Sequence, residues 1–213
     1  MTIPSLTDEA TLEFYKDKAP IYSATGKGGT SRFLHKFAKL LNTGSRILDL
    51  GCGGGRDSEE LLRLGFDVES WDGSFAIAKQ AEARIGRPVV VNRFDELDAR
   101  SKFDAIWASA SLLHVPKASL PQILTQIHRA LKPDGLHFAS YKSGGAQGRD
   151  SVGRYFNFLS RDQLLESYQR SGNWTIHSVQ EYTGGGYDQG QQGPWIAVIA
   201  SKSVLPIEKS SDV

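Results

Sequence analysis

The sequence is poor in cysteine, in long apolar segments and in excess charge of either sign. Cys52 is the single cysteine among 213 residues, which excludes an internal disulfide and a zinc site built from thiolates. No stretch approaches the roughly 18 consecutive apolar residues of a transmembrane helix. The 25 Lys and Arg residues nearly balance the 24 Asp and Glu residues, so the net charge gives no general attraction to nucleic acids or acidic membranes.

The first 20 residues also lack a positively charged start followed by an apolar run, which argues against a secretory signal. These absences together predict a cytoplasmic protein with no nucleic-acid and no membrane partner. The length fits one domain. We expect this domain to span residues 1–203, with a helical N-terminal extension or lid over residues 1–44 and a flexible tail over residues 204–213.

Glycine, in contrast, is abundant, at 22 residues or about 10% against an average near 7%. The glycines cluster at residues 26–29, 51–55, 144–153 and 184–193. Clustered glycines indicate backbone that turns tightly or approaches a ligand closely. In the fold expected below, the first and third clusters lie on connections near the ligand and are candidate moving lids.

Strand and helix patterns alternate through the middle of the chain, which predicts a largely parallel sheet. Strands are expected at residues 46–50, 67–72, 89–92, 103–109 and 136–142, with helices at 57–64, 75–85 and 119–131 between them. Further helices are expected near residues 7–18 and 31–41 and, after a capping box, at 160–171. Two last strands, at 174–182 and 195–202, are joined by a glycine-rich loop and predict an antiparallel pair at the sheet edge.

The strongest local signal is the strand-to-helix connection Gly51–Arg56, which reads G-C-G-G-G-R. Glycines there let the backbone reach a ligand, and the following helix start offers free N–H groups. Asp72 ends the next expected strand, about 20 residues further on, where a carboxylate can accept hydrogen bonds from a ribose diol. The alternatives are a purely structural glycine turn and a solvated Asp72-Gly73 turn.

The spacing of the glycines discriminates between nucleotide cofactors. Dinucleotide sites read G-x-G-x-x-G/A, and the last position of that pattern is Arg56 here. Arg56 cannot provide the close helix-to-strand packing that the third glycine serves. A nicotinamide-dependent oxidoreductase is therefore disfavoured but stays open as an alternative.

The segments 47–55, 68–74, 103–114 and 129–135 resemble the class I S-adenosylmethionine-dependent methyltransferases. The resemblance covers roughly residues 10–202 and is to the small bacterial-type domains similar to tellurite-resistance-type methyltransferases. It implies a Rossmann-like three-layer α/β sandwich whose seven-stranded, mostly parallel sheet has an antiparallel last strand. It also implies an enzyme that uses S-adenosyl-L-methionine and releases S-adenosyl-L-homocysteine, with no metal.

The same resemblance implies which residues hold the cofactor. The loop residues Gly51, Cys52 and Gly53 flank its methionine and ribose parts, Asp49 orders the loop, and Asp72 is the ribose-binding acid. The other expected contacts are Gly73, Ser74, the Phe94 backbone and Asp95 near the adenine, Ala108 and Ser109 near the methionine end, and Tyr15 and Tyr22 closing over the cofactor. Helix packing is the competing interpretation of the two tyrosines.

The sequence gives weaker evidence for the residues that contact the methyl acceptor. Candidate catalytic residues are His114, as a base, together with Tyr141 and Lys142, and candidate substrate residues are Arg149, Tyr155 and Phe156. No basic patch with interleaved aromatics and no added recognition domain is present, so a small-molecule acceptor is expected. A protein or RNA acceptor and a cofactor-binding protein without catalysis stay open, and we expect a monomer or homodimer.

Overall fold

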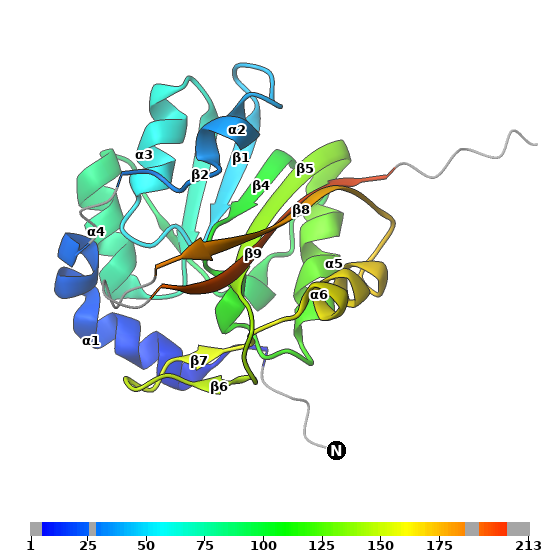
Figure 1. Ribbon diagram of the computed structural model, residues 1–213. Helices are drawn as coiled ribbons and strands as arrows, with labels where there is room; N and C mark the ends of the chain where they lie inside the picture. Colours follow the sequence, from blue (N-terminus) through cyan, green and yellow to red (C-terminus); the bar gives the residue numbers. More distant parts are fainter. Residues whose placement is uncertain (1–5, 26–28, 186–191, 204–213) are drawn as a thin grey trace, which may run out of the picture.

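We describe residues 6–25, 29–185 and 192–203 of the computed structural model, and the side chains of this range except those of residues 18–25. Here the chain forms a central sheet with helices on both faces (Figure 1). No helix among these residues has both the length and the apolar character needed to cross a membrane. Tyr22 and most of the two glycine clusters at 26–29 and 184–193 lie outside the described side chains or residues.

In the described residues, seven strands form the main sheet in the order β3-β2-β1-β4-β5-β9-β8. Their bounds are β1 Arg46–Leu50, β2 Asp67–Asp72, β3 Val90–Val91, β4 Phe103–Ala108, β5 Leu131–Lys142, β8 Trp174–Gly184 and β9 Gly193–Lys202. The strands β1 to β5 pair in parallel, whereas β9 is antiparallel to both β5 and β8. The predicted fold class, with its antiparallel last strand, is confirmed.

Helices fill the connections much as the sequence predicts. Their bounds are α1 Glu9–Thr25, α2 Leu34–Ala38, α3 Arg56–Arg63, α4 Phe75–Ile85, α5 Leu120–Ala130 and α6 Arg161–Gln169, with short 3₁₀ turns η1 Phe94–Glu96 and η2 Leu112–His114. The capping box of α6 is confirmed, because the Ser160 hydroxyl accepts from the Gln163 N–H and the Gln163 side chain accepts from the Ser160 N–H. The α2 helix is shorter than predicted, since only Leu34, Phe37 and Ala38 find a buried face.

Alternation along β1 divides the core between the two faces of the sheet. Ile47 packs with Phe37 and Leu61 on the face that α2 and α3 cover. Its neighbour Leu48 points to the opposite face and packs in the core with residues of α5 and α6, including Ile123. The α1 helix packs against α4, at the end of the sheet to which β1 points (Figure 1). This places α1 over the loops that follow the parallel strands.

A small hairpin, which the sequence did not predict, lies beside α1 (Figure 1). It pairs β6 Gly148–Arg149 with β7 Tyr155–Phe156. Its turn is held by Asp150, whose carboxylate accepts from the N–H groups of Val152 and Arg154, and by Gly153 with a φ of +88°. Two-residue strands lack a periodic pattern, so the turn chemistry was the only signal available.

Candidate active site

The glycine loop after β1 forms the floor of the site. Gly51 and Gly53 have left-handed φ angles of +81° and +54°. The Gly51 and Cys52 N–H groups both donate to the Trp71 carbonyl oxygen, at 2.9 and 2.8 Å. A Cβ on Gly51 would lie 2.5 Å from the Cβ of Ser111. A side chain therefore has no room at Gly51, and the bare backbone borders the pocket.

Asp72 ends β2 and ties this loop to the next one. Its carboxylate accepts from the Gly53 N–H at 3.0 Å and from the Ser74 N–H at 2.9 Å. Burial raises the pKa of Asp72 to about 6, against the opposing effect of these two hydrogen bonds. Each carboxylate oxygen keeps a second lone pair, so the group is an acceptor facing the pocket at neutral pH.

Asp49 lies beneath the loop rather than in the pocket. Its side chain is buried and accepts from the Ser58 hydroxyl at 2.6 Å, and Ser58 in turn accepts from the Ser70 hydroxyl at 2.7 Å. Burial, followed by the charge of Asp57, raises the pKa of Asp49 to about 8. These hydrogen bonds join β1, α3 and β2.

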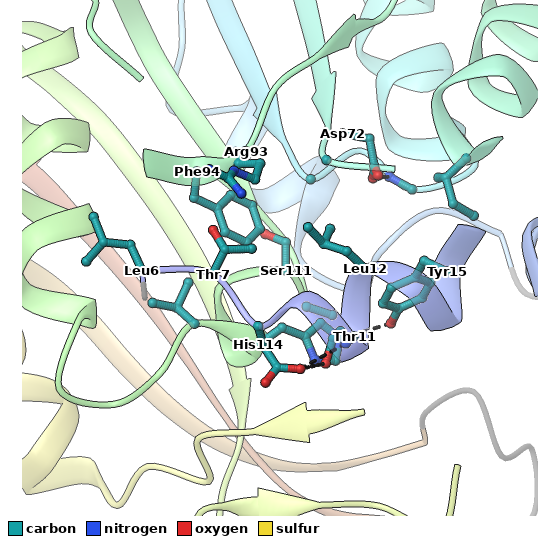
Figure 2. A pocket seen from close by; sticks show the side chains of 17 residues that line it. Leu6, Thr7, Thr11, Leu12, Tyr15, Asp72, Arg93, Phe94, Ser111 and His114 are labelled. Carbon is teal, nitrogen blue, oxygen red and sulfur yellow. Dashed lines mark hydrogen bonds between the residues drawn. The ribbon is translucent and has the colours of Figure 1, made fainter. Parts of the chain in front are cut away.

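A pocket opens between α1 and the loops after β1, β2, β3 and β4 (Figure 2). Ligands of open parallel sheets bind at the carboxyl ends of the strands, and this pocket has that position. Of the residues expected to contact a cofactor or substrate, the pocket lining includes Tyr15, Gly51, Gly53, Asp72, Gly73, Phe94 and His114. The remaining lining is Leu6, Thr7, Asp8, Thr11, Leu12, Ile77, Arg93, Ala110, Ser111 and Val115.

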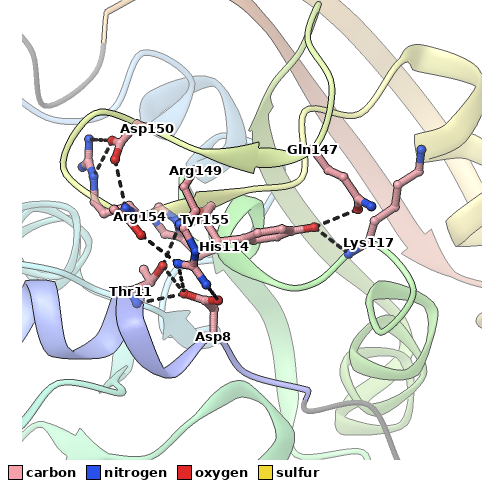
Figure 3. Close-up of polar contacts among 10 residues, drawn as sticks. Asp8, Thr11, His114, Lys117, Gln147, Arg149, Asp150, Arg154 and Tyr155 are labelled. Carbon is pink, nitrogen blue, oxygen red and sulfur yellow. Dashed lines mark hydrogen bonds and ion pairs between the residues drawn. The ribbon is translucent and has the colours of Figure 1, made fainter.

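The α1 segment is fastened to the hairpin on one side of the pocket (Figure 3). The Arg149 guanidinium donates to both carboxylate oxygens of Asp8, at 2.9 and 2.6 Å. The Tyr155 N–H donates to the Thr11 hydroxyl at 2.8 Å, and Thr11 itself donates to Asp8 at 2.7 Å. We call this set of contacts the Asp8 latch. Arg149 and the Tyr155 backbone therefore hold α1, which differs from the direct substrate contact expected of them.

A second set of contacts fastens α1 on the opposite side. The Thr7 hydroxyl donates to the Asp95 carboxylate at 3.2 Å, and Arg93 donates to Glu9 at 2.9 Å. Asp95 thus bonds to the α1 segment and is absent from the pocket lining, whereas its neighbours Arg93 and Phe94 border the pocket. The pocket is covered by a helix held at both edges.

Tyr15 and His114 meet at the end of the pocket nearest the hairpin (Figure 2). The Tyr15 hydroxyl lies 2.9 Å from Nε2 of His114, and Nδ1 lies 2.7 Å from the Tyr155 carbonyl oxygen. A carbonyl only accepts, so Nδ1 carries the proton and Nε2 accepts from Tyr15. Burial lowers the pKa of His114 to about 4, so the ring is neutral at pH 7 and Nε2 keeps its accepting lone pair.

Besides Arg149, four candidate residues of the acceptor side lie away from this pocket. Tyr141 was expected at the rim but is completely buried in the core, because β9 pairs with β5 as far as Lys142 and encloses residue 141 in the sheet. Burial also raises the pKa of its hydroxyl. Phe156 is buried behind His114, with ring centroids 4.7 Å apart. The Tyr155 hydroxyl donates to Gln147, and Lys142 lines a different cavity.

After β4 the pocket is bordered one or two residues later than expected. Ala108 is completely buried and Ser109 donates to the Ser31 hydroxyl, so neither lines the pocket. Ala110 and Ser111 do, because Ala110 turns the chain with a φ of +53°. Ser74 and Cys52 lie behind the lining, where Ser74 contributes its N–H to Asp72.

Half of the ten lining residues that the sequence interpretation missed come from residues 6–12. Leu6, Thr7, Asp8 and Leu12 line the pocket because the turn at Asp8 starts α1 directly above it. The available signal was a helix cap, since Asp8 accepts from the Thr11 N–H at 2.9 Å. A cap predicts where a helix begins but not what the helix covers, so the pocket could not be foreseen.

Comparison with known proteins identifies the family of the chain. A family model described as "Methyltransferase domain" matches residues 24–175. The ubiquinone biosynthesis O-methyltransferase of Xanthomonas oryzae pv. oryzae is 36% identical over 110 residues, which are 48% of this chain and 45% of that protein. The chain thus matches less than half the length of this curated relative.

Solved structures share the fold. A TehB-like S-adenosylmethionine-dependent methyltransferase of Corynebacterium glutamicum has a TM-score of 0.66 at 21% identity, covering 92% of this chain and 100% of that one. The 1,6-didemethyltoxoflavin-N1-methyltransferase of Burkholderia thailandensis, solved with bound 1,6-didemethyltoxoflavin and S-adenosylhomocysteine, has a TM-score of 0.69 at 19% identity, covering 96% of this chain and 94% of that one. The predicted resemblance is confirmed, and the chain belongs to the methyltransferase domain family.

Proposed function

We propose that the protein transfers the methyl group of S-adenosyl-L-methionine to a small-molecule acceptor and releases S-adenosyl-L-homocysteine. The observation that carries the proposal is the pocket at the carboxyl ends of β1, β2 and β4, where the Gly51 backbone and the Asp72 carboxylate face the same space. Family membership and the fold of the neighbouring structures support it.

The residues present fit this cofactor. The Gly51 backbone borders the pocket without a side chain, and Asp72 supplies a carboxylate acceptor for a ribose diol. Leu12, Ile77 and Phe94 provide apolar surface for a purine ring. When bound, S-adenosyl-L-methionine supplies an electrophilic methyl group on a sulfonium centre.

The chain's own contribution to methyl transfer is to position the reactants, exclude water and accept a proton. Closure by α1 screens the pocket from solvent on two sides through the Asp8 latch and the Thr7–Asp95 contact. A hydroxyl or ammonium acceptor also needs a base. Neutral His114, linked to the Tyr15 hydroxyl at 2.9 Å, can take that proton through Tyr15.

A small acceptor is favoured over a polymer. The names of both the Xanthomonas and Burkholderia proteins refer to small molecules, and the near-zero net charge offers no general attraction to RNA. The same proposal includes a cytoplasmic location, a monomeric or homodimeric state and a single domain over residues 1–203. It also includes a cofactor contact by Tyr22 and by the predicted residues that line the pocket.

The test has two stages. Calorimetric titration should show binding of S-adenosyl-L-methionine and S-adenosyl-L-homocysteine and no binding of NADH, with Asp72→Ala losing the binding while the far-ultraviolet spectrum is unchanged. The protein is then incubated with methyl-labelled cofactor and a metabolite extract, and the labelled product is identified by mass spectrometry. Binding of NADH alone would overturn the proposal. Label found only in protein or RNA would overturn the small-molecule acceptor.

A further inference from the structure

One residue, Asn157, holds the turn that carries His114. This turn, η2, has only three residues, and the hydrogen bonds inside such short 3₁₀ turns have poor geometry. Asn157 donates its backbone N–H to the Leu113 carbonyl oxygen at 2.9 Å. Its side-chain Nδ2 donates to the carbonyl oxygens of Leu112 at 3.0 Å and Val115 at 3.3 Å. Three carbonyl groups in and just after the turn therefore bond to a single distant residue.

The two residues before Asn157 hold the imidazole ring itself. The Tyr155 carbonyl oxygen accepts from Nδ1 of His114 at 2.7 Å (Figure 3). The Phe156 ring is buried and lies against the imidazole, with centroids 4.7 Å apart. The backbone and the ring of His114 are thus both held by residues 155–157. Because β7 and η2 lie far apart in the sequence, the bond from Nδ1 to Tyr155 depends on the contacts of Asn157 that join these two segments.

The side chain of Asn157 acts as a hydrogen-bond donor. It is 1% exposed and lies between the aromatic residues 156 and 158. Its Nδ2 makes the two bonds given above, whereas its Oδ1 accepts no hydrogen bond from the described residues. A leucine of similar shape could be buried there without the cost of an amide. What asparagine adds at this position is therefore donation to the carbonyl groups of η2.

The orientation of His114 decides which of its nitrogens can accept a proton. With Nδ1–H bonded to Tyr155, the lone pair of Nε2 faces the Tyr15 hydroxyl at 2.9 Å. A shift of the turn would break the Nδ1 bond and let the ring exchange between its two neutral tautomers. In the second tautomer Nε2 carries the proton and cannot accept from Tyr15.

We propose that Asn157 is a positioning residue for His114, which holds η2 against β7 and so keeps the ring in the Nδ1–H form that can accept a proton from the acceptor side. Asn157 does not itself line the pocket. The catalytic part of this inference rests on the proposed function, whereas the effect on the ring does not.

Nitrogen-15 spectra of the histidine rings at pH 7 test the positioning directly. His114→Gln identifies the His114 signals among those of the five histidines. The wild type should show the Nδ1–H form alone, and Asn157→Leu, which removes the side-chain donors at similar volume, should show both tautomers in exchange. The matched control is Phe37→Leu, which loosens packing against Trp107 and Phe138 on the opposite face of the sheet. It should leave the His114 signals unchanged.

Two spectroscopic outcomes would overturn the proposal. One is a retained Nδ1–H form in Asn157→Leu, and the other is an equal change in Phe37→Leu, which would indicate a general loosening of the fold. If Asn157→Leu does not fold, Asn157→Ala removes the same donors without adding bulk and allows the same comparison. Failure of both variants to fold would assign Asn157 to the stability of the fold and would also overturn the proposal.

Rate measurements test the catalytic part. With methyl-labelled cofactor and the metabolite extract, Asn157→Leu should form labelled product about tenfold or more slowly than the wild type, and binding of S-adenosyl-L-homocysteine should be unchanged. An unchanged rate, or a loss of cofactor binding, would overturn this part. Absence of labelled product with the wild type would contradict the proposed function instead, and the ring spectra, which need no acceptor, would still decide the role of Asn157.

Discussion

Gly51→Ala tests whether the close approach of backbone and Ser111 determines the site. At a φ of +81°, an alanine costs about 1–2 kcal/mol in backbone strain. Its Cβ would also lie 2.5 Å from the Cβ of Ser111, and relieving that overlap costs about 1–3 kcal/mol. Ser111 cannot move freely, because its hydroxyl donates to the Leu50 carbonyl oxygen at 2.7 Å. We therefore expect a loss of about 2–5 kcal/mol in the free energy of unfolding.

Gly86→Ala is the matched control for backbone strain. Gly86 ends α4 with a φ of +66°, and a Cβ there would meet no heavy atom within 4 Å. Thermal unfolding should show a fall in Tm of about 2–4 °C for each kcal/mol in a chain of this size, so Gly51→Ala should melt clearly below Gly86→Ala. Adding Ser111→Gly to Gly51→Ala removes the overlapping atom and should recover part of the difference. Equal melting of the two alanine variants would refute the packing argument.

The other predictions concern charge and closure. Affinity for S-adenosyl-L-homocysteine should fall about tenfold per pH unit below pH 6, because Asp72 becomes protonated there. Calorimetry of Asp72→Asn should show weaker binding that does not depend on pH in this way. Asp8→Asn keeps an oxygen for the Thr11 N–H but removes the ion pair with Arg149. Amide hydrogen exchange in α1 should therefore become faster, while Tm falls by under about 2 °C. Unchanged exchange would refute the Asp8 latch. Burial lowers the pKa of His137 to about 4, so below pH 6.5 the unfolded chain binds a proton that the folded chain does not, and stability falls as the pH drops from 6.5 toward 4. Urea unfolding at pH 7 and pH 5 should show about 2 kcal/mol less acid destabilisation in His137→Gln than in the wild type.

The cofactor half of the site was predictable because its signals are local. The Gly51–Gly55 loop, its strand and its helix occupy one short stretch, and Asp72 follows at the spacing that a parallel crossover imposes. Hydrophobic runs and stop signals placed the strands of the main sheet to within a few residues. The largest error in a strand start is β5, which begins at Leu131 because residue 131 pairs with Phe103 across a break in register.

The position of α1 over the pocket and the residues of the acceptor side were less predictable, because contacts between residues far apart in the sequence define them. Asp8 and Arg149 are 141 residues apart, and Tyr15 and His114 are 99 apart. No periodic pattern or spacing connects such positions. The predicted position of Tyr141 at the rim was wrong for a related reason. Its place at the end of an apolar run indicates the rim, but the strand β9, far along the chain, extends the sheet past it.

The protonation state of His114 links closure of the pocket to its chemistry. The ring has a lowered pKa chiefly because it is buried, and the groups that bury and orient it come from α1 and the hairpin, through Tyr15 and the Tyr155 carbonyl. The same two elements are joined by the Asp8 latch. Movement of α1 away from the hairpin would remove Tyr15 and expose the ring to water, and the pKa of His114 would return toward 6.5. Closure of the pocket therefore keeps His114 unprotonated at neutral pH, whereas opening makes the ring easier to protonate.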